Sequence, residues 1–200
     1  MNQDYLNLAK QRRSIYALGK EVSLSDQEIV DLVEPVIAES PTPFNNQTTR
    51  AVFLFGQAHD QLWDIVIERL KTEVPTAEAY AKTVAKLNSF KAGHGTILYF
   101  TDMAIVHQME QDFALYKDNF YDWSEQAQGI MTMGVWTTLA NNGIGASLQH
   151  YNPLIDEAVA QAFNIPENWR LRAEMPFGSI VAPAGTKEYM DAADRFKVFN

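Results

Sequence analysis

Two short polar segments carry side chains that could hold a phosphate group. In the first, Arg12, Arg13 and Ser14 follow a predicted helix. A guanidinium group offers a planar set of N–H donors that matches phosphate oxygens, and a serine hydroxyl adds one more donor. The basic triplet stands out because the chain has a net charge of −9. The alternative role for the two arginines is that of solvated helix-end residues, which the helix dipole favours.

The second segment is the turn at residues 40–47, with the sequence Ser-Pro-Thr-Pro-Phe-Asn-Asn-Gln. Its prolines and asparagines are ordinary turn residues and predict irregular backbone. A turn alone would not require Asn45, Asn46 and Gln47 together just before an apolar run. We therefore treat this turn as a second candidate binding segment.

Several kinds of chemistry lack the residues they need. The chain has no cysteine, and its four histidines are scattered without metal-binding spacing. There is no dinucleotide fingerprint and no Walker loop. The glycine pair from Gly143 to Gly145 follows a helix and precedes a strand, which is the reverse of the required order. Ser147 does not lie in the Gly-x-Ser-x-Gly context of a hydrolase elbow. No catalytic side chain and no metal site are predicted.

Hydrophobic periodicity predicts a helix-rich α+β fold. Expected helices cover 3–13, 26–37, 62–70, 76–90, 105–113, 124–142 and 153–163, and expected strands cover 51–55, 96–100, 146–151 and 169–177. Ser25 opens the second helix with a capping box, and Pro35 should kink that helix or end it early. The helix at 124–142 is apolar nearly all round, which is typical of a central or interface helix. The strand at 169–177 alternates, with Glu174 on its polar face.

Composition indicates one globular domain over residues 1–200, with 46% hydrophobic residues. The net charge of −9 and an isoelectric point near 4.9 argue against a nucleic-acid partner. No segment approaches the roughly 20 apolar residues of a membrane span. The start, Met1-Asn2-Gln3-Asp4-Tyr5, lacks the features of a signal peptide, so we expect a cytoplasmic protein with no membrane partner.

Taken in order, these segments resemble the FMN-dependent nitroreductase superfamily. The resemblance is to the compact branch that contains the yeast fatty-acid-repression-mutant proteins, and it rests on four segments, Arg12–Ser14, 40–47, 124–151 and Arg195-Phe196-Lys197. It implies a central mixed or antiparallel sheet flanked by helices, with a long buried interface helix. In that family an N-terminal Arg-x-Ser holds the flavin phosphate, and the turn contacts the same flavin from the partner subunit.

The resemblance implies a set of FMN-binding residues. They are Arg12, Arg13, Ser14, Tyr16, Pro41, Thr42, Asn45, Gln47, Asn88, Lys91, Leu148, Gln149, His150, Arg195 and Lys197. Some have equally ordinary alternatives: Asn88 and Lys91 as polar residues closing a helix, His150 as a core histidine, and the last two as a solvated tail. Tyr16 departs from the family pattern, in which a basic residue near flavin N1 stabilises the reduced cofactor.

The implied function is that of a homodimeric oxidoreductase. Hydride would pass from NADH or NADPH, through flavin N5, to a nitroaromatic, a quinone or a similar small planar oxidant in a ping-pong cycle. The cofactor supplies this chemistry, so no protein acid, base or nucleophile is required. Two alternatives stay open at this point: a low-turnover flavin-binding protein that regulates or stores flavin, and an α+β interaction protein without a cofactor.

Overall fold

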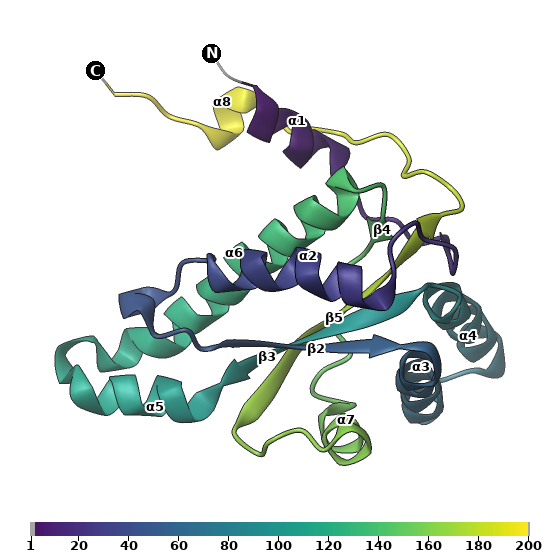
Figure 1. Ribbon diagram of the computed structural model, residues 1–200, viewed down its shortest axis with the longest axis horizontal. Coiled ribbons are helices and arrows are strands. Elements are labelled where there is room, and N and C mark those ends of the chain that lie inside the picture. Colours follow the sequence, from purple (N-terminus) through teal and green to yellow (C-terminus); the bar gives the residue numbers. More distant parts are fainter. Residues whose placement is uncertain (1–2, 200) are drawn as a thin grey trace.

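The computed structural model describes residues 3–199, and it shows one sheet between two layers of helices (Figure 1). Met1, Asn2 and Asn200, at the ends of the predicted domain, lie outside the described residues. The strands are β1 (Leu18–Gly19), β2 (Thr49–Phe55), β3 (Gly95–Asp102), β4 (Gly145–Ala146) and β5 (Trp169–Ile180). The helices are α1 (Asp4–Gln11), α2 (Asp26–Ala38), α3 (Gly56–Leu70), α4 (Ala77–Lys91), α5 (Met103–Asp112), α6 (Phe120–Asn141), α7 (Asp156–Phe163) and α8 (Ala192–Arg195), with 3₁₀ turns at Pro43–Asn45 and Ala114–Asn119.

The sheet has the order β1-β5-β3-β2, with β4 also on β5, and all of these pairs are antiparallel. This confirms the predicted α+β class. The strand expected at 51–55 is present, but it is not the buried strand that the apolar run predicted. Only Thr49 and Leu54 of β2 are buried, because β2 is an edge strand that pairs with β3 alone.

One face of the sheet is covered by α2 and α6 (Figure 1). The buried residues of this layer are Ile29, Val33, Ile97, Tyr99, Met131, Val135, Leu139, Ile144, Ala146, Ala173, Met175 and Phe177. The other face is covered by α3, α4 and α7. Its buried residues are Leu54, Leu62, Trp63, Val66, Leu70, Leu87, Phe90, Leu98, Phe100, Ile155, Val159 and Leu171.

Helices cover both faces of the sheet, and this explains why one expectation for the strand at 169–177 was wrong. The alternation in 169–177 placed Glu174 on a solvated face, yet Glu174 is 0% exposed. It pairs in register with Leu98, which belongs to the layer of α3, α4 and α7. Alternation separates the two faces of a strand, but it does not show whether a second layer covers the polar one.

Several local elements differ from expectation. The capping box at Ser25 is formed, but α2 continues through Pro35 to Ala38, because Val36 and Ile37 pack against the core. The 40–47 turn contains a short 3₁₀ segment, and the 153–163 helix begins only at Asp156. Of the strand expected at 146–151, a two-residue strand at 145–146 and one bridge from Gln149 to Glu174 are formed.

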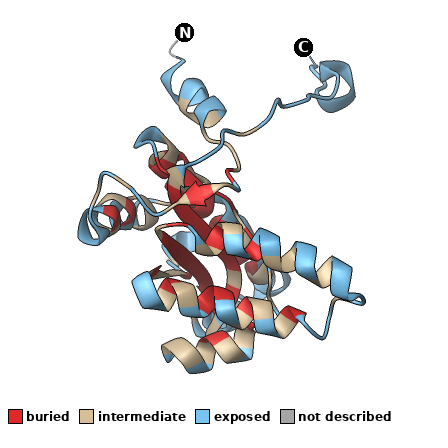
Figure 2. Ribbon diagram, turned by 90° about the vertical axis from the view of Figure 1, so that its right-hand side faces the viewer, coloured by how far each residue is buried: buried red, intermediate tan, exposed pale blue. Residues whose placement is uncertain are grey.

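The longest helix, α6, is buried along one side and exposed along the other. Figure 2 shows buried residues gathered on the sheet and on the helix sides that face it, whereas α1 and the C-terminal segment are largely exposed. Gln126, Gly129 and Ile130 lie on the exposed side of α6. None of the helices within residues 3–199 has the length and apolar character needed to cross a bilayer.

Candidate functional site

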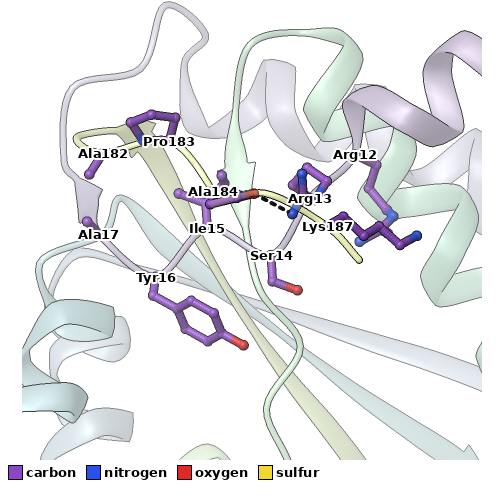
Figure 3. Close-up of a pocket in the computed structure, with 11 residues that line it drawn as sticks. Arg12, Arg13, Ser14, Ile15, Tyr16, Ala17, Ala182, Pro183, Ala184 and Lys187 are labelled. Atoms are coloured by element: carbon purple, nitrogen blue, oxygen red, sulfur yellow. Dashed lines mark hydrogen bonds between the residues drawn. The ribbon is translucent and has the colours of Figure 1, made fainter. Parts of the chain in front are cut away.

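The Arg12-Arg13-Ser14 triplet borders a cavity of about 470 Å³ (Figure 3). The segment Arg12–Ala17 forms one wall, and the loop Ala182–Gly185 with Lys187 forms the other. Two stretches almost the whole chain apart therefore meet here, at the end of α1 and just beyond β5.

Backbone hydrogen bonds hold the first wall in an extended conformation. Ser14 pairs with Ala146, and the Ile15 N–H donates to the Ala146 carbonyl at 2.9 Å. The Val181 N–H donates to the Ala17 carbonyl at 3.0 Å, which brings the second wall alongside. Because side chains alternate along an extended segment, Ser14 and Tyr16 point the same way (Figure 3).

Packing holds the Arg12 side chain in place, but one of its hydrogen-bond donors has no partner among the described residues. Its guanidinium carbon lies 4.3 Å from the centre of the Trp136 ring, a cation–π contact with α6. Its Nε is buried and has no hydrogen-bond partner among the described residues. Burial, and then the neighbouring Arg13, lower the pKa of Arg12. A buried donor on a cation is costly to leave unpaired, so an anion in the cavity would satisfy it.

The surroundings of Arg12 are strongly cationic. A second cavity of about 210 Å³ shares Arg12, Arg13 and Lys187 with the first and adds Lys10. No Asp or Glu is among the described residues that line either cavity. This happens in a chain with 25 acidic and 16 basic residues. The local charge therefore favours an anionic ligand despite the net charge of the protein.

Two residues at the cavity act in ways that the sequence did not indicate. Arg13 uses one guanidinium nitrogen to donate to the Gly185 carbonyl at 2.8 Å, so it braces the opposite wall (Figure 3). Lys187 lines the cavity, but as a lone lysine in a polar stretch it gave no sequence signal. Arg195 and Lys197 lie further along an exposed tail and do not line this cavity.

The 40–47 turn is rigidly constructed and conformationally unusual. The Thr42 hydroxyl accepts from the Gln47 N–H at 2.9 Å, and the Thr42 carbonyl accepts from the Asn45 N–H at 2.9 Å. Phe44, Asn45 and Gln47 all have φ between 51° and 54°. Positive φ is rare for side chains such as phenylalanine and often marks functional segments.

The turn and the Arg12 cavity lie toward opposite ends of α6. The Phe44 ring lies 6.4 Å from the Trp123 ring, whereas Arg12 stacks on Trp136. At about 1.5 Å per residue, these two levels of the helix are roughly 20 Å apart. The Pro41 and Thr42 side of the turn instead lines an apolar cavity of about 240 Å³ with Trp123. One chain therefore does not bring the two predicted binding segments together.

The segment from Leu148 to His150 lies against β5. The Gln149 N–H donates to the Glu174 carbonyl at 2.8 Å, and the Gln149 side chain donates to the Ser147 hydroxyl at 3.0 Å. The backbone donor of Gln149 is thus already used, whereas the Leu148 N–H has no partner within residues 3–199.

The open question about His150 is answered by its exposure. His150 is exposed, and its pKa is lowered by partial burial and then by Arg172. It is therefore not a core histidine. His59 has that role, at 1% exposure, with its Nδ1 2.9 Å from the Thr96 hydroxyl.

Asn88 and Lys91 lie at the end of α4 and do not line the Arg12 cavity. Asn88 is exposed, and its carbonyl caps the helix by accepting from Ala92. The Lys91 ammonium forms an ion pair with Asp64 at 2.5 Å. Its charge is therefore already matched within the chain.

The sequence matches the model of one known protein family. The nitroreductase family model covers residues 9–179, which is most of the chain. The chain belongs to the nitroreductase family. The resemblance inferred from the four segments is thereby confirmed.

Curated nitroreductases and solved nitroreductase structures show the same relationship. Putative nitroreductase HBN1 of Saccharomyces cerevisiae is 34% identical over 188 residues, covering 93% of each chain, and nitroreductase FRM2 of the same yeast is 29% identical over 94% of each. The solved nitroreductase CinD from Lactococcus lactis superposes with a TM-score of 0.91 at 50% identity, covering 98% of this chain and all of that one. A solved Saccharomyces cerevisiae nitroreductase gives 0.77 at 30% identity, covering 90% of this chain and 98% of that one. These matches confirm the predicted nitroreductase-like fold.

Proposed function

We propose that this nitroreductase-family oxidoreductase binds FMN and transfers hydride from NADH or NADPH to nitroaromatics, quinones or similar planar acceptors. The observation that carries the proposal is the Arg12 cavity. Within residues 3–199 its lining is cationic and contains no carboxylate, and the buried Arg12 Nε has no hydrogen-bond partner. When bound, FMN supplies the hydride chemistry itself. The chain's own residues bind and orient it.

Three groups of the cavity suit the FMN phosphate, which carries close to two negative charges near neutral pH. Arg12 offers its free Nε, Ser14 its hydroxyl and Lys187 its ammonium group. Arg13 contributes charge, but one of its nitrogens is held by Gly185. We assign Arg195 and Lys197 a supporting role only if the exposed tail folds back in the assembled protein.

Tyr16 affects how much positive charge the chain offers to the flavin ring, next to the phosphate. Its side chain is 51% exposed and points to the same side as Ser14 (Figure 3). A phenol can donate a hydrogen bond to the flavin pyrimidine ring but brings no positive charge. Lys91, the other candidate cation, is paired with Asp64. We therefore infer that reduced flavin is less stabilised here than in relatives with a basic residue at this place.

The site is completed by a second copy of the chain in this proposal. The Arg12 cavity and the turn at Thr42 are roughly 20 Å apart along α6, so one subunit would supply the phosphate end and its partner the turn. A shallow groove of about 700 Å³ runs along the exposed side of α6 and includes Ile130, which is 49% exposed. Among the described residues that line it, Glu39 is the one that carries a charge. A two-fold contact along this face would bury it.

The ligands of a solved relative support the substrate classes. CinD from Lactococcus lactis has been solved in complex with nicotinic acid, chloramphenicol and 4-nitrophenol. The first has a pyridine ring like that of nicotinamide, and the other two are nitroaromatic. At about half identity, we infer the same two classes for this chain. We place the reaction in the cytoplasm, where reduced nicotinamide dinucleotides are available.

The phosphate assignment is tested by measuring FMN affinity. Arg12→Ala should weaken binding by about 1.5–3 kcal/mol, the magnitude of a hydrogen bond to a charged group, or roughly 10- to 150-fold. Arg12→Lys should recover part of this loss, because it keeps the charge but not the Nε donor. Lys82→Ala, which removes an exposed cation on α4, is the matched control and should leave affinity unchanged.

The same titration, followed by anaerobic addition of NADH or NADPH, separates the alternatives. Unchanged affinity in Arg12→Ala would place the phosphate elsewhere. No FMN binding to the wild-type protein would support a cofactor-free interaction protein. Tight binding without reduction by either dinucleotide would support a flavin store or regulator.

A further inference from the structure

A small polar cavity of about 170 Å³ lies between α6 and the sheet, away from the Arg12 cavity. Its lining residues are Tyr99, Glu125, Gln128, Gly129, Thr132, Leu148, His150, Arg172 and Ala173. The segment that includes Leu148 and His150 forms part of its wall. The resemblance of residues 124–151 to the nitroreductase superfamily implies that this segment is the strand beneath the flavin ring.

Gln128 presents an unpaired acceptor. Its amide nitrogen donates to the Phe100 carbonyl and, at 3.0 Å, to the Thr101 hydroxyl. A carbonyl oxygen can only accept, so this contact fixes which way the amide is oriented. The other end, Oε1, is buried and has no partner among the described residues, although the residue is only 6% exposed. An acceptor left in this state requires a donor from outside the chain.

Glu125, one turn earlier on α6, presents a second such acceptor. Arg172 donates to Glu125 Oε2 from Nε at 3.0 Å and also from Nη2. Both bonds fall on one oxygen. The other, Oε1, is buried and unpaired within the described residues. The cavity therefore offers two oxygen acceptors, and the charge of Glu125 is balanced by Arg172.

Gly129 lines this cavity and also the groove along the exposed side of α6. A Cβ added there would meet nothing within 4 Å, so no neighbour in the chain requires glycine. Glycine inside a helix is nevertheless unfavourable relative to alanine. The missing side chain leaves open space beside Gln128.

We propose that this cavity binds the carboxamide of the reduced nicotinamide ring, whose amide N–H groups donate to Gln128 Oε1 and Glu125 Oε1. The inference rests on the proposed function and deepens it. Of the reactants in that function, nitroaromatics and quinones present oxygen acceptors, whereas reduced nicotinamide presents a primary amide. Two unpaired acceptors select the reactant that has donors, because a buried polar group discriminates strongly against a ligand that leaves it unpaired.

The experiment compares NADH with reduced 3-acetylpyridine adenine dinucleotide, in which an acetyl group replaces the carboxamide and removes its N–H donors. Rapid mixing with the FMN-loaded protein under anaerobic conditions gives the apparent Kd and the reduction rate for each. The wild-type protein should bind NADH at least about tenfold more tightly, the effect of one unpaired buried acceptor. A dinucleotide changed only in its adenine base should show no such loss.

Three variants test whether the preference for NADH over the acetyl analogue arises in this cavity. Gln128→Met removes one of the two acceptors at similar volume, so it should lower the preference for NADH by about tenfold relative to wild type, and Glu125 accounts for the preference that remains. Gly129→Ala places a methyl group in the cavity and should weaken NADH binding without lowering the melting temperature. Gln161→Met, the same change on the exposed face of α7, should leave the preference as in wild type.

Two results would overturn the inference. Equal affinity of the wild-type protein for NADH and the acetyl analogue would mean that the cavity holds only water. Loss of FMN affinity in Gln128→Met, with the dinucleotide preference intact, would mean that the flavin edge occupies it. In both cases reduction of the flavin by NADH would leave the proposed function standing, whereas absence of reduction would refute that function instead.

Discussion

Replacing Glu174 by glutamine should remove a pH dependence of stability that this one carboxyl creates. Glu174 lies in the middle of β5, is 0% exposed and accepts a hydrogen bond from the Tyr151 N–H at 3.0 Å. Its second oxygen is buried and unpaired within residues 3–199. Burial is the main cause that raises the pKa of Glu174 to about 8. Asp156 raises it further, and the Tyr151 bond lowers it.

The sign and the size of this pH dependence of stability follow from proton linkage. An unfolded chain loses this proton near pH 4.5, whereas the folded protein keeps it until about pH 8. Between these values the unfolded state binds fewer protons, so stability falls as pH rises, by about 1.4 kcal/mol per pH unit. From about pH 5 to about pH 7.5 the loss is about 3 kcal/mol. Above about pH 8 this dependence ends.

Glu174→Gln is neutral at every pH, keeps an acceptor for the Tyr151 N–H and supplies an amide donor in place of the acid proton. The free energy of unfolding of the variant minus that of wild type should therefore increase by about 3 kcal/mol between about pH 5 and about pH 7.5. Urea unfolding followed by tryptophan fluorescence gives this difference directly, since Trp63 is buried in the same layer. Taking the difference cancels the other titrating groups.

The control for Glu174→Gln is the same change at an exposed glutamate near β5. Glu167→Gln alters an exposed carboxyl just before β5 and serves as the matched control. If the Glu174→Gln difference is flat to within about 0.5 kcal/mol, Glu174 is ionised in the folded protein at neutral pH and the reasoning from burial fails.

Three further predictions concern stability. Ser25→Ala removes the capping-box acceptor of α2 and should lower the free energy of unfolding by about 1 kcal/mol in urea titrations; no change would show that the cap contributes nothing. Met131→Ala, at the fully buried centre of α6, should cost about 2–5 kcal/mol by the same measurement, and a cost below about 1 kcal/mol would mean that this layer is loosely packed. Gly178→Ala would drive a Cβ into the Gly19 carbonyl and should lower the melting temperature sharply, whereas Gly185→Ala, which meets nothing within 4 Å, should not; equal melting temperatures would contradict the close approach of β1 and β5.

The sequence predicted individual elements better than their layering. Periodicity and the Ser25 cap located α2, α3, α4 and α6, because those signals are local. The burial of Glu174 was missed, since alternation along β5 cannot show that α3, α4 and α7 cover its polar face. The partial exposure of β2 was missed for a related reason: a continuous apolar run does not show that its strand is at an edge.

The candidate site was predicted in part. Arg12, Arg13, Ser14 and Tyr16 line one cavity, because they are near one another in the sequence and the segment after α1 is hydrogen-bonded to Ala146 and Val181 at the edge of the sheet. The position of Lys187 at the cavity could not be predicted from the sequence, because it depends on the path of the chain after β5. The roughly 20 Å between the Arg12 cavity and the Thr42 turn depends on where each packs along α6. The roles of Arg195, Lys197, Asn88 and Lys91 in cofactor binding stay predictions.

The central claim is that this chain uses bound FMN to accept hydride from a nicotinamide dinucleotide. The most direct test is to load the purified protein with FMN and titrate it anaerobically with NADH and with NADPH, following the visible absorbance of oxidised flavin. We predict that at least one dinucleotide bleaches the flavin stoichiometrically and that a nitroaromatic or quinone then restores the colour. A flavin that binds and stays fully oxidised with both dinucleotides would contradict the account.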